Sequence, residues 1–311
     1  MKGKKGKPND RTSRKKMLAL AGAAVVIVGA VAAFMWLNRG EKTVEASYTP
    51  VTRFVDIHGL AVDPANPNTL YVATHHGLIR GVDDSNWALV GNYRADFMGF
   101  SMHPDGKIFY TSGHKVPEAP NIGVARSDDY GLTWKIIALR GRVDFHAMAI
   151  SRANPQILYA WYYRDGRLYK STDEGKSWQN PKAEGLRNVI ALATDPADEN
   201  TVWAATERGV FRSEDGGESF ELMSFSGAPV ITVAVDPANS KTLYASLQTG
   251  LRKSTDGGQS WQGIGEDIGE FVGHLAIDPT DSDIIYAATY SAAIYKSTDG
   301  GLSWQLIKRG E

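Results

Sequence analysis

The chain has 311 residues, of which 42% are apolar, and a formal net charge of −1. This length allows one large domain or two ordinary ones, with enough apolar material for a sizeable core. It contains no cysteine, which excludes a disulfide framework, a lipid-modified cysteine and a cysteine-based zinc site.

The charge is unevenly distributed along the chain. Residues 1–39 carry nine Lys or Arg and a single acidic residue, Asp10, whereas the remainder has 25 basic and 34 acidic residues. Residues 1–16 form a basic segment, and residues 17–37 (MLALAGAAVVIVGAVAAFMWL) run for 21 residues without a charge. As a helix, this stretch spans the ~30 Å hydrocarbon core of a bilayer. Because positive flanks stay in the cytoplasm, we predict an uncleaved single-pass membrane anchor with a cytoplasmic N-terminus.

A cleaved signal peptide is the alternative for the same segment, although its apolar region normally spans only about 7 to 15 residues. Residues 38–54 follow as a short linker, and residues 55–311 form the main domain. We expect this domain to lie outside the cytoplasm, held at the cell membrane. Its acidic composition lacks the basic face that nucleic-acid binding needs, so nucleic acid is excluded as a partner.

An eight-residue pattern, Ser-x-Asp-x-Gly-x-Ser/Thr-aromatic, recurs through the main domain. The five copies are SDDYGLTW (127–134), STDEGKSW (171–178), SEDGGESF (213–220), STDGGQSW (254–261) and STDGGLSW (297–304). A degenerate sixth copy, GVDDSNW, occupies residues 81–87, and successive motif Asp residues are 46, 44, 42, 41 and 43 residues apart. A period in the low forties suits one four-stranded blade of a β-propeller.

Each unit shows alternating strand patterns, Asp-Pro turns and no helical period. The sequence therefore predicts an all-β, six-bladed β-propeller preceded by one transmembrane helix. The count leaves open a seventh, degenerate blade, and residues 44–54 are candidates for an extra outer or edge strand at ring closure.

We interpret the motif aspartates as structural. An Asp in this position accepts backbone N–H groups within the turn, the Gly supplies a positive φ, and the aromatic residue fills space between strands or blades. A calcium role is disfavoured because the bidentate Glu of an EF-hand loop is missing. The residues concerned are Asp129, Asp173, Asp215, Asp256 and Asp299.

The repeated motif resembles that of the Asp-box, or BNR-repeat, propellers, which include sialidases, sortilin-type receptors and photosystem II assembly factors. The strings HGLAVDPANPNTLYVATHHGL (58–78), DFMGFSMHP (96–104) and FHAMAI (145–150) are also similar to bacterial and archaeal secreted proteins labelled glycosyl hydrolases. This resemblance implies the fold, and a glycosidase-like activity only as an option, because one fold hosts many functions. The arginine triad of sialidases begins in an Arg-Ile-Pro motif, which this chain lacks; Arg53, Arg94, Arg142 and Arg164 are unassigned.

Polar residues gather where first strands begin and second strands end, which in a propeller is one face around the channel, opposite the Asp boxes. First strands begin at Asp56, Asp96 and Asp144 in units one to three, against Asn188, Pro229 and Phe271 later. Second strands of units one to three end in His75-His76, His114 and Tyr162-Tyr163-Arg164. Six of the seven histidines map to this face, and His103 maps to the other. A solvated rim or a structural Asp/His network is the plain alternative to a binding site.

Three functions suit this channel mouth. The first is recognition of a glycan, a peptide or an envelope protein through His58, His75, His76, His114, His146, Tyr162, Tyr163 and Arg164. The second is glycoside hydrolysis by paired carboxylates from Asp56, Asp96 and Asp144. The third is a divalent metal site for Zn²⁺, Cu²⁺ or Mn²⁺, with His58 and His146 as leading ligands, joined by His75, His76, His114 and Asp56 or Asp144.

Overall fold

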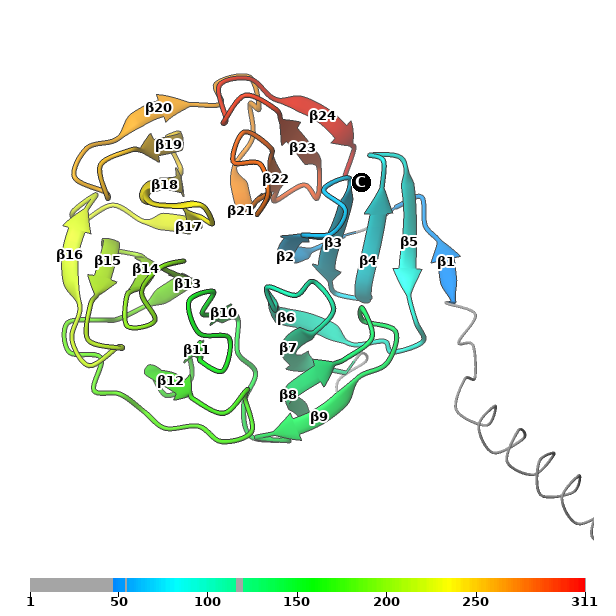
Figure 1. The fold of residues 1–311 in the computed structure, drawn as a ribbon, viewed down its shortest axis with the longest axis horizontal. Coiled ribbons are helices and arrows are strands. Elements are labelled where there is room, and N and C mark those ends of the chain that lie inside the picture. The colour runs from blue at the N-terminus through cyan, green and yellow to red at the C-terminus, as the bar shows by residue number, and fades with distance from the viewer. Residues whose placement is uncertain (1–46, 54, 116–119, 311) are drawn as a thin grey trace, which may run out of the picture. The chain divides into compact units, whose positions relative to one another are not determined.

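The main domain is a ring of β-sheets around a central channel (Figure 1). The computed structural model describes residues 47–53, 55–115 and 120–310, and every regular element in them is a strand. These strands form six sheets, each taken from one continuous stretch of chain, so the predicted all-β six-bladed propeller is confirmed. The predicted anchor at residues 17–37 lies outside the described residues. Within the described ranges, no helix is long and apolar enough to cross a membrane.

The chain enters each blade beside the channel and moves outward strand by strand. The innermost strands are β2 (Ile57–Val62), β6 (Asp96–Met102), β10 (Ala147–Ile150), β13 (Val189–Thr194), β17 (Val230–Asp236) and β21 (Val272–Ile277). The second strands are β3 (Thr69–Thr74), β7 (Phe109–His114), β11 (Leu158–Tyr162), β14 (Val202–Thr206), β18 (Asn239–Leu247) and β22 (Ile285–Thr289). First and second strands pair antiparallel, so the start of one lies beside the end of the other.

The outer half of each blade repeats the same antiparallel order. The third strands are β4 (Gly77–Val82), β8 (Asn121–Ser127), β12 (Arg167–Ser171), β15 (Gly209–Ser213), β19 (Gly250–Ser254) and β23 (Ile294–Ser297). The outer strands are β5 (Asn86–Val90), β9 (Lys135–Ala138), β16 (Glu221–Ser224), β20 (Gln262–Ile264) and β24 (Gln305–Lys308). We number the blades 1 to 6 in chain order.

Two blades depart from four strands. Blade 3 lacks a regular outer strand, which is reduced to a bridge between Lys170 and Gln179. Pro181 follows two residues later and cannot donate to a ladder, which explains why pairing stops. Blade 1 gains a fifth strand, because β1 (Tyr48–Pro50) pairs with β5 at its outer edge, as anticipated for residues 44–54.

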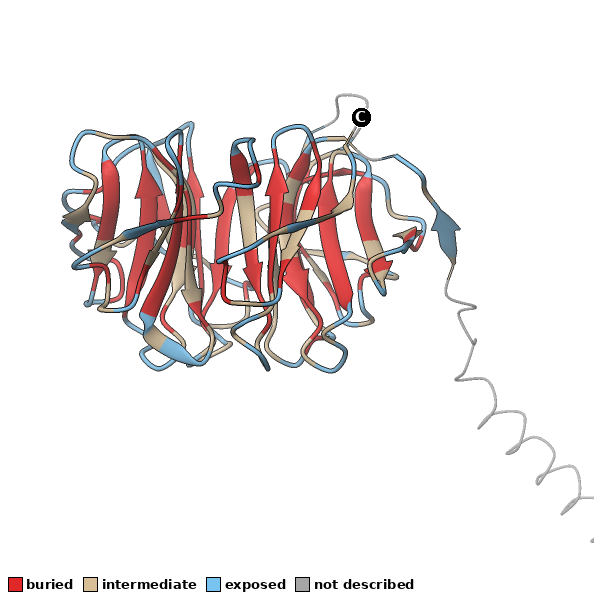
Figure 2. Ribbon diagram, turned by 90° about the horizontal axis from the view of Figure 1, so that it is seen from above, coloured by how far each residue is buried: buried red, intermediate tan, exposed pale blue. Residues whose placement is uncertain are grey.

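The core is divided into six apolar clusters, one between each pair of neighbouring blades. Figure 2 shows the result: the second strands of the blades are buried along most of their length, whereas the outer strands and the loops at both ends of the ring are mostly half-buried or exposed. The motif aromatic of each repeat packs into one of these clusters; they are Trp134, Trp178, Phe220, Trp261 and Trp304. Each repeat therefore supplies the packing between its own blade and the preceding one.

The repeated octapeptides form near-identical turns between third and outer strands. In blade 3 the Ser171 hydroxyl donates to Asp173 Oδ1 (2.8 Å) and accepts from the Gly175 N–H (2.8 Å). The Ser177 N–H donates to Asp173 Oδ1 (2.8 Å), and its hydroxyl donates to Oδ2 (2.6 Å). The corresponding contacts recur at Asp129, Asp215, Asp256 and Asp299. Both oxygens of each carboxylate are thus used inside the turn.

The degenerate sixth copy lies where the ring closes. Lys296 of blade 6 lies 3.0 Å from the Asp84 carboxylate of blade 1, and the Tyr286 hydroxyl donates to the Pro67 carbonyl (3.2 Å). Asp84 has a positive φ of 57°, a conformation that Asp adopts more readily than most residues. The sequence change in this copy therefore coincides with the closure contact between the last blade and the first.

Candidate functional site

The start of each first strand meets the end of the second strand at one face, which we call the channel mouth. In blade 2, Asp96 lies directly opposite His114 in the β6–β7 pairing. Gly113 permits this approach, since a Cβ there would lie 1.8 Å from the Asp96 carbonyl oxygen and its φ is +153°. The Ser112 hydroxyl accepts from the Phe145 N–H (2.9 Å), which ties blade 2 to the residue after Asp144. Local backbone contacts thus bring Asp96, His114 and Asp144 together.

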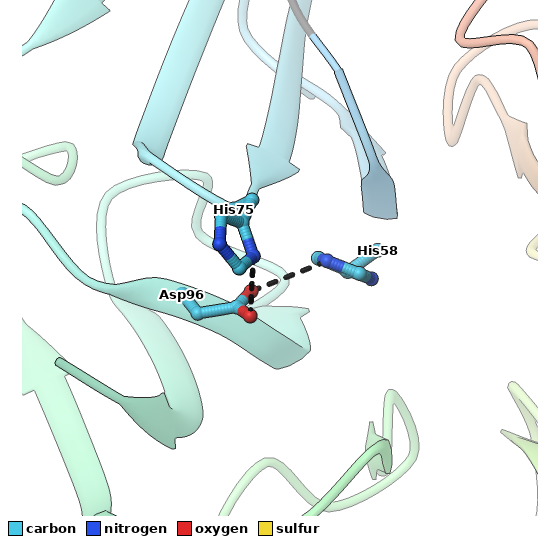
Figure 3. A group of neighbouring side chains, drawn as sticks. All are labelled: His58, His75 and Asp96. Carbon is cyan, nitrogen blue, oxygen red and sulfur yellow. Dashed lines mark ion pairs between the residues drawn. The ribbon is translucent and has the colours of Figure 1, made fainter. Parts of the chain in front are cut away.

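Asp96 is the centre of a cluster of imidazoles. Its Oδ1 lies 3.2 Å from His58 Nε2 of β2, and its Oδ2 lies 2.7 Å from His75 Nδ1, just after β3. Figure 3 shows these side chains converging from three separate segments of blades 1 and 2. His114 Nε2 lies 3.6 Å from the same Oδ2. The Asp96 side chain is only 3% exposed, so this carboxylate is held in the protein interior with histidines as its neighbours.

Asp144 extends the cluster into blade 3. His114 Nδ1 forms a hydrogen bond with Asp144 Oδ2 at 3.1 Å, and His146 Nε2 lies 3.7 Å from the same oxygen. His114 therefore lies between two carboxylates, one facing each of its ring nitrogens. A neutral imidazole has a single N–H and can donate to one of them at a time.

Three buried polar atoms in this cluster have no hydrogen-bond partner: His58 Nε2, Asp96 Oδ1 and Asp144 Oδ1. His58 Nε2 and Asp96 Oδ1 are close, at 3.2 Å, but are not aligned as a hydrogen bond. Buried polar groups are nearly always satisfied, and an unsatisfied one costs about 1–3 kcal/mol. His58 Nε2 and Asp96 Oδ1 therefore contact each other as an ion pair rather than as an aligned hydrogen bond.

The electrostatics of the cluster favour an ionised Asp96. Burial by itself raises the pKa of this carboxyl, but the attraction of His58, His75 and His114 outweighs it and holds the pKa below its usual value. Deeper in the channel, burial lowers the pKa of His274 to about 4, and the neighbouring His58 acts in the same direction. His274 is accordingly neutral near pH 7.

The channel itself is a cavity of about 260 Å³ lined by the innermost strands and by His58, His146 and His274. Arg152 also lines it and was not anticipated as a site residue. It stands where five other units have a proline (Pro64, Pro104, Pro196, Pro237 and Pro279), and that break in the repeat was the available sequence signal. Burial lowers the pKa of its guanidinium.

The predicted mouth residues divide into two groups. The His/Asp contacts bring together His58, His75, Asp96, His114, Asp144 and His146. Asp56 does not join these contacts: it is exposed and has a φ of 50°, as does Asn188 at the same position of blade 4. The left-handed backbone accounts for this difference from Asp96 and Asp144, which have no positive φ.

The remaining predicted residues form the rim or the core. His76 is exposed and packs edge-on against His75, with 5.2 Å between ring centroids. Tyr163 is 52% exposed, lies 5.0 Å from the His146 ring and accepts a hydrogen bond from Arg164 Nε (3.1 Å). Tyr162 is 9% exposed and packs in the apolar cluster between blades 2 and 3, where a ligand has little access to it.

A second cavity, of about 880 Å³, lies at the same face between blades 5 and 6. We call it the blade 5–6 groove; it is lined by Gln248, Arg252, Glu266, Glu270, Phe271 and Tyr290, together with loop residues. Phe271 and Tyr290 are 55% and 67% exposed and occupy the mouth positions of blade 6. The sequence places Phe271 at the start of a first strand but does not predict either aromatic as a site residue.

No protein-family model and no curated protein matches the chain. Among solved structures, the GH74 xyloglucanase from Xanthomonas campestris superposes with a TM-score of 0.58 at 18% identity, over 85% of this chain and 56% of the enzyme. YCF48 with a bound D1 peptide gives 0.53 at 18% identity, over 84% of each chain. A chain of the nidogen/laminin complex gives 0.59 at 11% identity, over 73% of this chain and 88% of that one. The chain spans little more than half of the xyloglucanase, and at these identities what is shared is the β-propeller fold.

Proposed function

We propose that the chain is a membrane-anchored, extracytoplasmic recognition propeller that binds an extended peptide segment of an envelope protein across its channel-mouth face. The anchor and the location follow from residues 17–37 and their basic flank. The observation that carries the proposal is the mouth: buried Asp96 and Asp144 among partly exposed imidazoles, bordered by Tyr163 and Arg164. Charged groups held in this way are a typical setting for ligand binding.

Binding is favoured over glycoside hydrolysis by the state of the carboxylates. A hydrolase of this type needs one carboxylic acid whose pKa is raised, so that it protonates the leaving group. The pKa of Asp96 is lowered instead, because three histidines surround it. Asp56, the third candidate carboxylate, is exposed and does not join the His/Asp contacts of the cluster. The contacts of Asp96 therefore suit recognition better than the role of a general acid.

An extended ligand is favoured because two separate sites lie on one face. The His/Asp cluster occupies the mouth of blades 1–3, and the blade 5–6 groove opens beside it with exposed Phe271 and Tyr290. The likeness to YCF48, which was solved with a peptide bound, extends over most of both chains and supports a peptide. A glycan is the second candidate, since exposed aromatic side chains also stack on sugar rings.

The test is a screen of the purified full chain against a library of envelope-protein peptides and against a glycan array. We expect selected peptides to bind, and the double variant Tyr163→Ala/Arg164→Ala to weaken binding about tenfold or more, which corresponds to about 1.4 kcal/mol. Tyr130→Ala is the matched control, because Tyr130 is 42% exposed in the turn of blade 2 at the opposite face.

Each other outcome has a distinct meaning. If only glycans bind, the ligand is a sugar polymer rather than a peptide. If neither library yields a ligand whose affinity depends on Tyr163 and Arg164, the recognition proposal is wrong. Turnover of a glycoside that disappears in Asp96→Asn/Asp144→Asn would instead establish the hydrolase.

A further inference from the structure

We infer that the channel mouth binds one divalent first-row transition-metal ion, with Zn²⁺ as the leading candidate, through His58, His75 and Asp96. This metal site rests on the proposed function because it lies at the same channel mouth. It deepens that function by adding a metal ion that a bound ligand would contact.

The three side chains already have the spacing of a metal site. One ligand atom from each lies within 4.8 Å of the others, and the individual contacts to Asp96 are 3.2 Å and 2.7 Å. Ligands at 2.0–2.1 Å around a tetrahedral Zn²⁺ are about 3.3 Å apart, so small side-chain movements accommodate the ion. As Figure 3 shows, the ligands come from the beginning of β2, the end of β3 and the beginning of β6, so an ion would link blades 1 and 2.

The unsatisfied atoms point to the same place. His58 Nε2 and Asp96 Oδ1 are buried without hydrogen-bond partners, although the side chain of Asp96 is only 3% exposed. A lone pair on each atom, directed at a shared cation, would satisfy both at once.

His114 and Asp144 form the supporting layer of the site. When His114 donates its Nδ1–H to Asp144, its Nε2 carries a lone pair directed toward Asp96 Oδ2, 3.6 Å away. Two acceptors face each other in that tautomer, and a cation between them removes the repulsion. Carboxylate–histidine pairs of this kind orient metal-binding imidazoles in many proteins. His114 is thus placed to act as a fourth ligand, with Asp144 as its positioning residue.

The donor set selects the class of ion. Imidazole nitrogens with a carboxylate suit Zn²⁺, Cu²⁺, Fe²⁺ and Ni²⁺, whereas Ca²⁺ takes six to eight oxygens and Mg²⁺ retains its waters. Neither hard cation is matched by two or three imidazoles. His75 is 36% exposed, so the site opens to solvent and leaves room for a water or a carboxylate of a bound partner.

The experiment is calorimetric titration of ZnCl₂ into the full chain, purified without a histidine tag and treated with EDTA. We expect one ion per chain and a higher melting temperature with zinc. Binding should be lost in Asp96→Asn and in His58→Gln, and should weaken roughly 10–100-fold in Asp144→Asn through misorientation of His114. His103→Gln is the matched control: His103 pairs with Asp105 (3.0 Å) at the opposite face and should leave zinc binding unchanged.

CoCl₂ provides a second readout, because visible absorption distinguishes imidazole-ligated Co²⁺ from the aqueous ion. If Asp96→Asn fails to fold, His58→Gln and His75→Gln carry the test, since these side chains are 20% and 36% exposed. Absence of stoichiometric binding by the wild type overturns the inference. The inference is also overturned if the wild type and the folded ligand variants bind zinc with equal affinity.

The two proposals fail separately. Zinc binding is measured without any peptide, and peptide binding is measured with and without EDTA. Peptide binding with no metal uptake would remove only the metal site. Metal uptake with no peptide or glycan ligand would remove only the proposed function.

Discussion

The channel mouth of blades 1–3 differs sharply from that of blades 4–6, although the backbone positions correspond. Blades 2 and 3 place Asp96 and Asp144 there among histidines. Blade 4 places Asn188 and Glu207 there, joined by a hydrogen bond of 2.6 Å, and both side chains are exposed. Blade 4 shows that this fold closes its rim without a buried carboxylate. The propeller fold therefore does not require the Asp/His cluster, and this supports the proposal that the cluster binds a ligand.

The strongest test of this comparison is to give blade 2 the residues of blade 4. In Asp96→Asn/His114→Glu we expect the melting temperature of the metal-free chain to stay within a few degrees and zinc binding to be lost entirely. Calorimetry and thermal melts measure both quantities. A chain that no longer folds would show that Asp96 and His114 are needed for folding, and the zinc test then depends on His58→Gln and His75→Gln.

A second test concerns the aromatic mouth of blade 6. Phe271→Ala/Tyr290→Ala should lower peptide affinity roughly tenfold while leaving zinc affinity unchanged. Because these side chains are 55% and 67% exposed, the free energy of unfolding should change by less than about 0.5 kcal/mol per site. Leu302→Ala is the control, an equally exposed apolar residue (70%) at the opposite face. A loss of zinc affinity in the aromatic variant would mean that the two regions are one site.

The smallest expected effect lies at the opposite face. Asp215→Ala removes the acceptor for the Ser219 N–H (3.0 Å) and the Ser213 hydroxyl (2.7 Å) and should lower stability by about 1–2 kcal/mol. For a domain of this size, each kcal/mol of lost stability lowers the melting temperature by about 2–4 °C. Ligand binding and zinc binding should be unchanged. Glu214→Ala is the control, because its exposed pair with Arg212 contributes little.

The difference in stability between the wild type and Asp215→Ala should also depend on pH. Hydrogen bonds from Ser219 lower the pKa of Asp215 from 3.8 to about 2. A carboxyl group whose pKa is lower in the folded state stabilises that state at pH values above the pKa of the unfolded chain. This stabilisation is lost as the pH falls through the pKa of the folded state. The difference between wild type and Asp215→Ala should therefore shrink between about pH 4 and pH 2 in urea titrations. A difference that is constant over this range would contradict the shifted pKa.

The sequence predicted the ring because the information is local and repeated. Each motif carries its own turn and its own packing aromatic, so blade number and strand order follow from spacing alone. The mouth was also predictable, since aligned strand ends place Asp96, His114 and Asp144 on one face. Individual contacts were not: the left-handed φ of Asp56 separates it from Asp96, yet both aspartates look equivalent in the alignment of repeats.

Features built between blades were the hardest to anticipate. The blade 5–6 groove combines three stretches of chain around Gln248, Gly265 and Tyr290, and none of them contains a motif. Arg152 is not part of the repeated pattern: it stands where the other five units have a proline, so the repeats alone do not predict it as a channel residue. The missing outer strand of blade 3 depends on one proline, Pro181, in an otherwise polar segment.

In the part of the chain that the structure describes, each sheet is built from one uninterrupted stretch of chain, and no strand is exchanged between the last blade and the first. A blade is therefore a module that can be copied whole. Each copy contains its own motif aromatic residue, which packs against the preceding blade, and its own turn built around the motif Asp. The two mouth residues of a blade lie at the ends of strands, outside this packing. The residues at the channel mouth can consequently differ from blade to blade with little effect on the fold. They are His and Asp in blades 1–3 and aromatic residues in blade 6.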